Sequence, residues 1–272
     1  MMVNTETAKY DFDKECSNVL QAKGVTFSYG KKPVLDNLDF DVAKGDFIGL
    51  IGPNGSGKTT LLKLLMHILS PSKGKICLKG RVMGDMKRRE ISQQIAFVPQ
   101  EENSNFVFSA LEIVLMGRSP YLKGFQMEGD YDIEVTKKAM SITDCWQFKE
   151  RDILTLSGGE RKRVFIARAL AQEPEIILMD EPTTHLDINH QVEIMEKMRE
   201  LNEAGLTIIM VSHDINLASS FCTRLAVLKD GKIITSGKPE EIVNSKLLES
   251  VYGCRLKVFS KDNRPIVTLM RA

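Results

Sequence analysis

Residues Gly52 to Thr59 constrain the fold of this chain more than any other stretch. They read Gly-Pro-Asn-Gly-Ser-Gly-Lys-Thr and match the pattern G-x-x-x-x-G-K-[ST], in which a loop between a strand and a helix cradles phosphate groups. The pattern is informative only in that context. The apolar run Phe47–Ile51 predicts the strand, and Thr60–Leu69 predicts the helix. We therefore expect a nucleotide site built on an α/β core.

The residue types of this loop explain how it would hold a phosphate. Its glycines allow tight turns that aim backbone N–H groups at an anion, beside a helix N-terminus whose dipole also favours negative charge. Lys58 would reach the β- and γ-phosphates, and the Thr59 hydroxyl would bind Mg²⁺. A glycine-rich turn with an unrelated lysine is the alternative, which the flanking strand and helix disfavour. The predicted nucleotide-binding residues are Gly52, Pro53, Asn54, Gly55, Ser56, Gly57, Lys58, Thr59 and Thr60.

The net charge and the cysteines argue against several other classes of protein. The 272 residues include 37 Lys and Arg against 36 Asp and Glu, so the net charge does not favour nucleic acid or an anionic lipid surface as the main partner. Five dispersed cysteines form no C-x-x-C pair, which disfavours a metal cluster or a disulfide framework and favours a reducing compartment. No apolar run reaches about 18 residues and no charged-then-apolar leader is present, so we expect neither a membrane span nor a secretory signal.

The pattern of apolar residues predicts an α/β fold with a mainly parallel sheet and an antiparallel β-subdomain. Phe47–Ile51, Ile176–Met179 and Ile208–Val211 are apolar on both faces, as in central parallel strands that helices cover. Val25–Tyr29 and Leu38–Val42 alternate apolar and polar residues, as in strands with one buried face.

The remaining segments predict the organisation of a single domain. Residues 1–18 are polar and acidic, and predict a flexible extension to a domain of residues 19–272. Helical patterns predict a helical insertion over residues 101–157. Asp230-Gly231 predicts a hairpin turn, and Leu256–Met270 a final strand pair. A helix over Ile188–Asn202 would bury one face, which comprises Ile188, Val192, Met195, Met198 and Leu201.

Two carboxylates end the second buried strand. In Ile176-Ile177-Leu178-Met179-Asp180-Glu181, Asp180 would hold Mg²⁺ through water and Glu181 would polarise the attacking water. Two acids at a strand end are otherwise common in solvated loops. Their combination with the phosphate loop favours the hydrolytic interpretation.

The stretch Leu156-Ser157-Gly158-Gly159-Glu160 supports two interpretations that are compatible. Ser157 and Glu160 match the S-x-x-E capping box of a helix N-terminus. A cap alone does not explain two glycines in a first turn, each of which costs about 0.8–1 kcal/mol relative to alanine. We therefore expect something, such as a second phosphate, to approach this backbone closely.

At this stretch the chain resembles the ATP-binding-cassette ATPases, whose signature motif LSGGQ is present here as LSGGE. The resemblance covers nearly the whole chain after the first 20 or so residues. It implies that Tyr29 stacks on adenine, although a core-packing tyrosine is the alternative. It implies that Gln100 senses Mg²⁺ and the attacking water, that His213 contacts the γ-phosphate and orients that water, and that Asp187 communicates between subunits. The other histidines, His67, His185 and His190, form no plausible metal-ligand set.

The resemblance further implies a homodimer. In this family Ser157, Gly158 and Gly159 of one subunit close on the nucleotide that the phosphate loop of the other subunit holds. A single chain would then lack a complete site.

Three stretches look like the iron–siderophore, haem and cobalamin importer ATPases, namely Phe108–Tyr121, Thr183–Gln191 and Glu249–Cys254. This resemblance implies that MgATP-driven dimer closure is coupled to ligand uptake through two transmembrane permease subunits and an extracytoplasmic substrate-binding protein. The ATPase would lie peripherally on the cytoplasmic face of the cell membrane, without a nucleic acid partner. A soluble cassette ATPase of assembly or repair is the alternative. A GTPase or small-molecule kinase is disfavoured, because there is no N-K-x-D motif and LSGGE would be unexplained.

Overall fold

The computed structural model describes residues 18–100, 107–124 and 126–269. Nearly all of the predicted N-terminal extension therefore lies outside the described residues, as do Cys16 and Met270.

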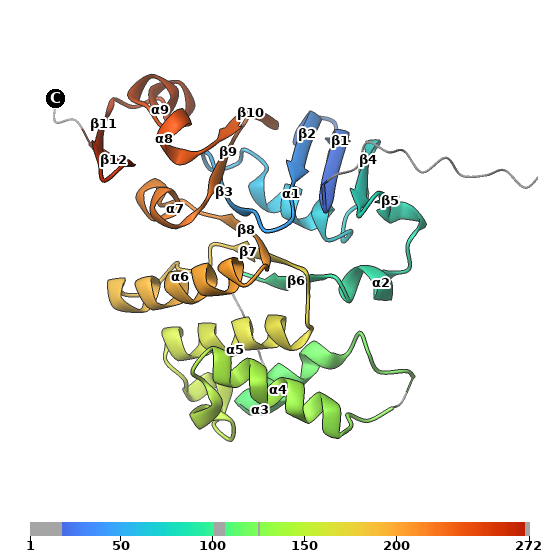
Figure 1. The fold of residues 1–272 in the computed structure, drawn as a ribbon. Coiled ribbons are helices and arrows are strands. Elements are labelled where there is room, and N and C mark those ends of the chain that lie inside the picture. The colour runs from blue at the N-terminus through green and yellow to red at the C-terminus, as the bar shows by residue number, and fades with distance from the viewer. Residues whose placement is uncertain (1–17, 101–106, 125, 270–272) are drawn as a thin grey trace, which may run out of the picture.

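Six strands form the central sheet, in the spatial order β10 (Lys232–Gly237), β9 (Arg224–Lys229), β3 (Phe47–Ile51), β8 (Thr207–Val211), β7 (Ile176–Asp180) and β6 (Ile95–Val98). All neighbours pair in parallel except β10, which returns antiparallel to β9 (Figure 1). Every residue of β3, β7 and β8 is buried, because helices or the second sheet cover both faces. The predicted parallel core is confirmed.

A four-stranded antiparallel sheet has the order β2 (Leu35–Val42), β1 (Leu20–Phe27), β4 (Lys73–Leu78) and β5 (Arg81–Val82). The prediction for the first strand was wrong in its bounds, since β1 begins at Leu20 rather than Val25. Gly24 adopts φ 59°, and the pairing of β1 with both neighbours shifts register nearby. This irregularity breaks the alternation, so the sequence pattern reveals only the second half of the strand.

The helix after the phosphate loop is α1 (Lys58–Leu65), which begins and ends earlier than the predicted Thr60–Leu69. It ends early because His67 adopts φ 55°, a left-handed conformation that cannot continue a right-handed helix. The N–H groups of Ile68 and Leu69 then both donate to the Lys63 carbonyl, at 2.9 and 3.2 Å.

The helical insertion contains α3 (Ala110–Leu115), α4 (Asp130–Ile142) and the short 3₁₀ helices η2 (Met116–Arg118), η3 (Trp146–Phe148) and η4 (Ile153–Thr155). These elements pack on α5 (Gly158–Ala171) and form a hydrophobic core of their own. Within residues 107–124 and 126–152 the only β-pairing is an isolated bridge between Ser109 and Asp152. The insertion forms the separate lower part of the molecule in Figure 1.

The other helices are η1 (Met83–Asp85), α2 (Arg88–Ser92), α6 (Ile188–Glu203), α7 (Ile215–Phe221), α8 (Pro239–Ile242) and α9 (Ser245–Tyr252). The predicted buried face of α6 is only partly right. Met195 and Met198 are fully buried, whereas Ile188 is 76% and Val192 is 42% exposed. The core that receives α6 contacts its C-terminal half, so the first two turns present apolar side chains to the surface.

Two hairpins were predicted and both are present. Asp230 and Gly231 adopt φ 49° and 76° between β9 and β10, the left-handed pair that a two-residue hairpin turn requires. The final pair is β11 (Leu256–Lys261) and β12 (Arg264–Leu269), which turns at Asp262 and Asn263, also with positive φ.

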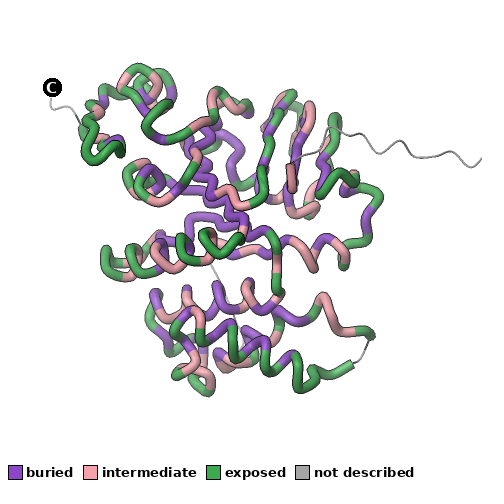
Figure 2. Tube along the Cα trace, in the orientation of Figure 1, coloured by how far each residue is buried: buried purple, intermediate pink, exposed green. Residues whose placement is uncertain are grey.

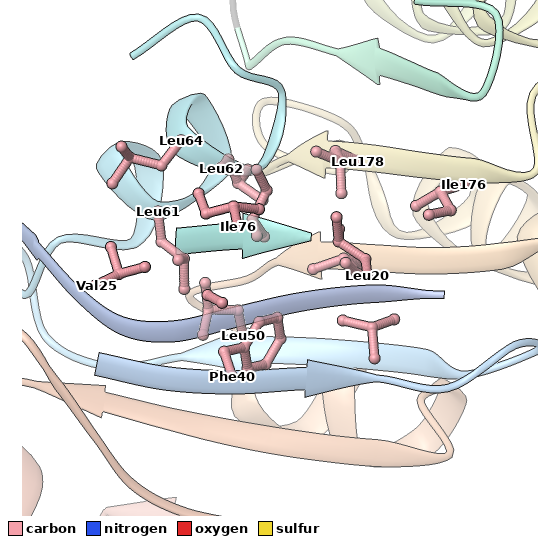
Figure 3. Close-up of a cluster of buried hydrophobic side chains, with 14 of the residues drawn as sticks. Leu20, Val25, Phe40, Leu50, Leu61, Leu62, Leu64, Ile76, Ile176 and Leu178 are labelled. Carbon is pink, nitrogen blue, oxygen red and sulfur yellow. The ribbon is translucent and has the colours of Figure 1, made fainter. Parts of the chain in front are cut away.

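Hydrophobic clusters lie on both faces of the central sheet. One joins α1 and the four-stranded sheet to one face (Figure 3), and the other joins α5, α6, α7 and α9 to the opposite face. The central strands are accordingly the most continuously buried part of the chain in Figure 2. None of the helices in the described part of the chain has the length and apolar character that crossing a membrane needs.

Replacing Leu178 with Ala should destabilise the fold by about 2–5 kcal/mol, because it leaves a cavity between α1 and the sheet. Leu178 is fully buried, whereas Ile234 on β10 is 49% exposed. Chemical denaturation of the Leu178→Ala and Ile234→Ala variants measures the difference. Equal effects would contradict the core described above.

Candidate functional site

At two positions of the loop between β3 and α1, both the backbone conformation and a close neighbour favour glycine. Gly52 adopts φ 151°, and a Cβ there would lie 2.0 Å from the Leu228 carbonyl oxygen. Gly57 adopts φ 106°, and a Cβ there would lie 2.6 Å from Leu35 Cδ2. These contacts with β9 and β2 hold the loop in the conformation that starts α1 with its N-terminus open.

The N-terminus of α1 has no side-chain cap, because its N-cap residue is Gly57, and no acidic residue lies in the first turn. The first N–H groups of a helix have no partner within the helix. They carry partial positive charge, which the helix dipole increases. This end of α1 is therefore suited to an anion.

Lys58 lies directly at this N-terminus and is 6% exposed. Its Nζ donates to the carbonyl oxygens of Gly52 and Pro53, at 2.8 and 3.0 Å. Burial lowers the pKa of Lys58, and the nearby carboxylates of Glu181 and Asp180 partly offset that shift. The lysine is thus a buried cation that neutral carbonyls hold inside the loop, where phosphate oxygens would be stronger partners.

A pocket of about 310 Å³ opens beside Lys58. The pocket brings together residues from the ends of three parallel strands, where ligands of open α/β sheets usually bind. Its lining is Val34, Asn54, Gly55, Gly57, Lys58, Thr59, Thr60, Glu181 and His213. Most of the predicted phosphate-loop residues and two predicted catalytic residues therefore share one site.

Asp180 ends β7 and is almost fully buried. Burial is the main cause that raises its pKa, while a hydrogen bond with the Thr59 side chain and the charge of Lys58 oppose the shift. Its Oδ1 has no hydrogen-bond partner among the described residues. A buried carboxylate oxygen without a partner, next to a threonine hydroxyl, is the hard-oxygen donor set that Mg²⁺ prefers. The residues therefore fit the predicted metal.

Three side chains orient the Glu181 carboxylate. Gln100 Nε2 and Thr184 Oγ1 donate to Glu181 Oε2 at 2.9 and 3.0 Å, and His213 Nε2 contacts Oε1. The backbone of Glu181 adopts φ 47°, an uncommon conformation for a residue other than glycine. The structure thus joins the predicted catalytic residues Gln100, Glu181 and His213 in one hydrogen-bonded group.

Two parts of the site were not predicted from the sequence, namely the Thr184 side chain and the turn between β9 and β10. Thr184 was noted only as part of a longer motif, since its contact with Glu181 depends on how the chain turns after β7. The turn between β9 and β10 also supports the phosphate loop. The Gly231 N–H donates to the Ser56 carbonyl at 3.2 Å, and the Gly231 carbonyl accepts from the Asp36 N–H at 3.1 Å. The Asp230-Gly231 pair predicts a turn but not what the turn contacts.

The signature stretch forms the predicted capping box. Ser157 Oγ accepts from the Glu160 N–H at 3.3 Å, and Glu160 Oε2 accepts from the Ser157 N–H at 2.8 Å. A Cβ at Gly159 would lie 2.6 Å from the His190 ring, which would have to shift, so contact within the chain already favours glycine there. A Cβ at Gly158 would make only an ordinary contact with Leu186, at 3.5 Å. Contact within the chain therefore accounts for Gly159 but not for Gly158, where a phosphate could approach the backbone.

Eight predicted nucleotide contacts do not line the pocket. Three belong to the phosphate loop, namely Gly52, Pro53 and Ser56, and the other five are Tyr29, Ser157, Gly158, Gly159 and Asp187. Asp187 caps α6, where Oδ1 accepts from the His190 N–H at 2.9 Å and contacts His190 Nδ1 at 2.8 Å. Tyr29 is 64% exposed, with its ring 4.9 Å from that of Phe27 at an interplanar angle of 87°. Its ring is therefore not part of the hydrophobic core.

The sequence profile of the family described as ABC transporter matches residues 35–184. The petrobactin import ATP-binding protein FpuD of Bacillus anthracis is 40% identical over 86% of this chain and 86% of its own. The ferric enterobactin transport ATP-binding protein FepC of Escherichia coli (strain K12) is 38% identical over 88% of this chain and 89% of its own. The hemin import ATP-binding protein HmuV of Rhodococcus jostii (strain RHA1) is 38% identical over 88% and 81%.

Two solved structures are similar to most of this chain. An inward-facing conformation of a candidate metal-chelate type ABC transporter has a TM-score of 0.82 and 29% identity, over 94% of this chain and 98% of its own. The dimeric post-hydrolysis state of the ATP-binding cassette MJ0796, bound to ADP and Pi, has a TM-score of 0.71 and 32% identity, over 80% and 98%.

Replacing Lys58 with Ala should weaken ATP binding about 10- to 100-fold, because a charge-assisted hydrogen bond to phosphate contributes roughly 1.5–3 kcal/mol. Titration with a fluorescent ATP analogue measures the dissociation constant. Lys44→Ala removes an exposed lysine just before β3 and serves as the control. Equal affinity in the two variants would count against the phosphate-loop assignment.

Replacing Glu181 with Gln should leave ATP binding intact and lower turnover by about 100-fold or more, because the amide cannot accept the proton of the attacking water. The two side chains have nearly the same shape, so the contacts with Gln100 and Thr184 can persist. Phosphate release and size-exclusion chromatography with MgATP would measure turnover and the accumulation of a nucleotide-bound dimer. A variant with normal turnover would refute the assigned role.

Proposed function

The chain belongs to the ABC transporter family and is an ATPase of that family, and we propose that it drives the uptake of an iron–siderophore, haem or cobalamin-type ligand. The observation that carries the hydrolytic part is the position of the Glu181 carboxylate, which Gln100, Thr184 and His213 hold at the pocket that Lys58 lines. The choice of ligand class rests on relatives that import petrobactin, enterobactin and hemin.

The chemistry follows from where the charges lie. When a triphosphate enters, Lys58 can exchange the carbonyls of Gly52 and Pro53 for phosphate oxygens, while the uncapped amides of α1 bind the same anion. Thr59 and Asp180 would hold Mg²⁺, which when bound neutralises charge on the phosphates. Glu181 would orient a water and accept its proton. His213 would contact the γ-phosphate and help to orient the same water. Gln100 restrains the carboxylate meanwhile.

We infer that the active unit is a homodimer. Ser157 and the adjacent glycines lie at the N-terminus of α5 and do not line the pocket of their own chain. This position supports a contact with the nucleotide of a second chain, for which the missing side chain of Gly158 leaves room. Asp187 at the start of α6 would face the same partner. Dimeric cassettes among the solved relatives support this arrangement.

The transported ligand would never contact this chain. Two permease subunits would carry it across the membrane, an extracytoplasmic substrate-binding protein would deliver it, and the ATPase would lie peripherally on the cytoplasmic face. Gln100 contacts Glu181 and lies at the entrance to the helical insertion, so rearrangement at the nucleotide can move that insertion relative to the sheet.

Within the importer-like stretch Phe108–Tyr121, Arg118 is 1% exposed and its Nε donates to Asp132 at 2.8 Å. Its Nη1 donates to Glu173 at 2.8 Å and to the Ala171 carbonyl at 2.7 Å. This residue ties the helical insertion to the end of α5. Part of the resemblance therefore reflects packing, and the importer assignment needs its own test.

An affinity-tagged full-length chain should co-purify with a polytopic membrane protein from detergent-solubilised membranes, because the proposed function requires permease subunits. Cells that carry only the Lys58→Ala variant should lose uptake of radioactive iron–siderophore or haem, whereas Lys44→Ala should retain it. A stable complex with soluble proteins alone, together with unchanged uptake, would favour an assembly or repair ATPase instead.

A further inference from the structure

The segment that carries His213 is held on both sides. Before it, the Ser212 N–H donates to the Leu50 carbonyl of β3 at 3.2 Å, and Ser212 Oγ donates to the Asp214 carbonyl at 3.1 Å. After it, Asp214 caps α7, with its Oδ1 accepting from the Leu217 N–H at 2.9 Å. The position of the His213 side chain therefore depends on where α7 lies.

The C-terminal hairpin makes two hydrogen bonds with the first turn of α7. Asn216 Nδ2 donates to the Val267 carbonyl at 3.0 Å, and the Val267 N–H donates to Asn216 Oδ1 at 2.7 Å. Two hydrogen bonds to one residue of β12 fix the plane of the amide. Asn216 follows His213 by three residues, less than one helical turn.

The same hairpin also holds the other end of α7. Arg264 Nη1 donates to the Ser219 carbonyl at 3.0 Å and to the Cys222 carbonyl at 3.4 Å. These carbonyls lie at the C-terminus of the helix, where a cation is favourable and partners are otherwise missing. Between the two ends, apolar side chains of the helix and the hairpin share one cluster, to which Ile215, Leu217, Phe221, Val258 and Val267 contribute.

The hairpin has no other sheet to join in the described part of the chain, since β11 and β12 pair only with each other. An isolated two-stranded hairpin is marginally stable by itself. Figure 1 shows it at the edge of the molecule beside α7 and α8, and none of its residues lines the nucleotide pocket. Its contacts with α7 therefore do not serve nucleotide binding directly.

We propose that the β11–β12 hairpin is a clamp on α7, and that Asn216 and Arg264 are positioning residues that keep His213 against Glu181. This inference rests on the proposed role of His213 in hydrolysis. His213 itself is exposed, and its Nε2 contacts Oε1 of Glu181. Without the clamp α7 can shift, and the imidazole moves with it.

Asn216→Ala in the full-length chain should lower kcat for ATP hydrolysis about 3- to 30-fold, because a displacement of about 1 Å at a catalytic group can cost as much as 100-fold. KM for ATP should change little, since the hairpin does not touch the pocket.

Ser220→Ala is the matched control, because Ser220 Oγ donates only within α7, to the Asn216 carbonyl at 2.8 Å. Arg264→Ala should reproduce the effect from the other end of the helix. Thermal unfolding of each variant reports whether the fold is intact.

The decisive measurement repeats Asn216→Ala and Arg264→Ala in a His213→Ala background. If the clamp acts through His213, each should then change kcat less than about 2-fold, the non-additivity expected of residues that act as a unit. The same fold-loss in both backgrounds, or an unchanged kcat of Asn216→Ala alone, would overturn the clamp while leaving the hydrolytic role of His213 intact. A wild-type kcat in His213→Ala alone would instead refute that role, and the clamp with it.

Discussion

The pairing of parallel strands β3, β8 and β7 is the constraint on which the rest of the molecule depends. Because these strands run in the same direction, the loops that follow them emerge at one edge of the sheet. Those loops carry Lys58, Glu181 and His213, which lie far apart in the sequence and line one pocket. All three strands are completely buried, so the arrangement of the pocket residues is a consequence of the core.

Two ionisable groups of opposite charge, Lys58 and Asp180, are buried beside the phosphate loop. Lys58 donates to neutral carbonyls. Burial lowers the pKa of Lys58 and raises the pKa of Asp180, so it disfavours the charged form of both groups. Each charged form gains a stronger partner when a triphosphate and its metal enter.

Polar contacts tie two peripheral parts of the molecule to helices that pack on the central sheet. Buried Arg118 ties the helical insertion to the end of α5 through Asp132 and Glu173. Asn216 and Arg264 tie the C-terminal hairpin to α7, which continues from His213. In both places a few charged or amide side chains each make several hydrogen bonds. A small displacement of the insertion or of the hairpin would therefore break specific hydrogen bonds.

The sequence by itself determined the features that depend on neighbouring residues. The phosphate loop, the Ser157–Glu160 cap and the Asp230-Gly231 turn follow from residue types at fixed short spacings, and all three are present. Tertiary packing decided the rest, because long-range contacts leave no local pattern. It ended α1 at Leu65 rather than Leu69, extended β1 back to Leu20 and exposed Ile188. It also placed the His190 ring against Gly159, Thr184 against Glu181 and the hairpin against α7.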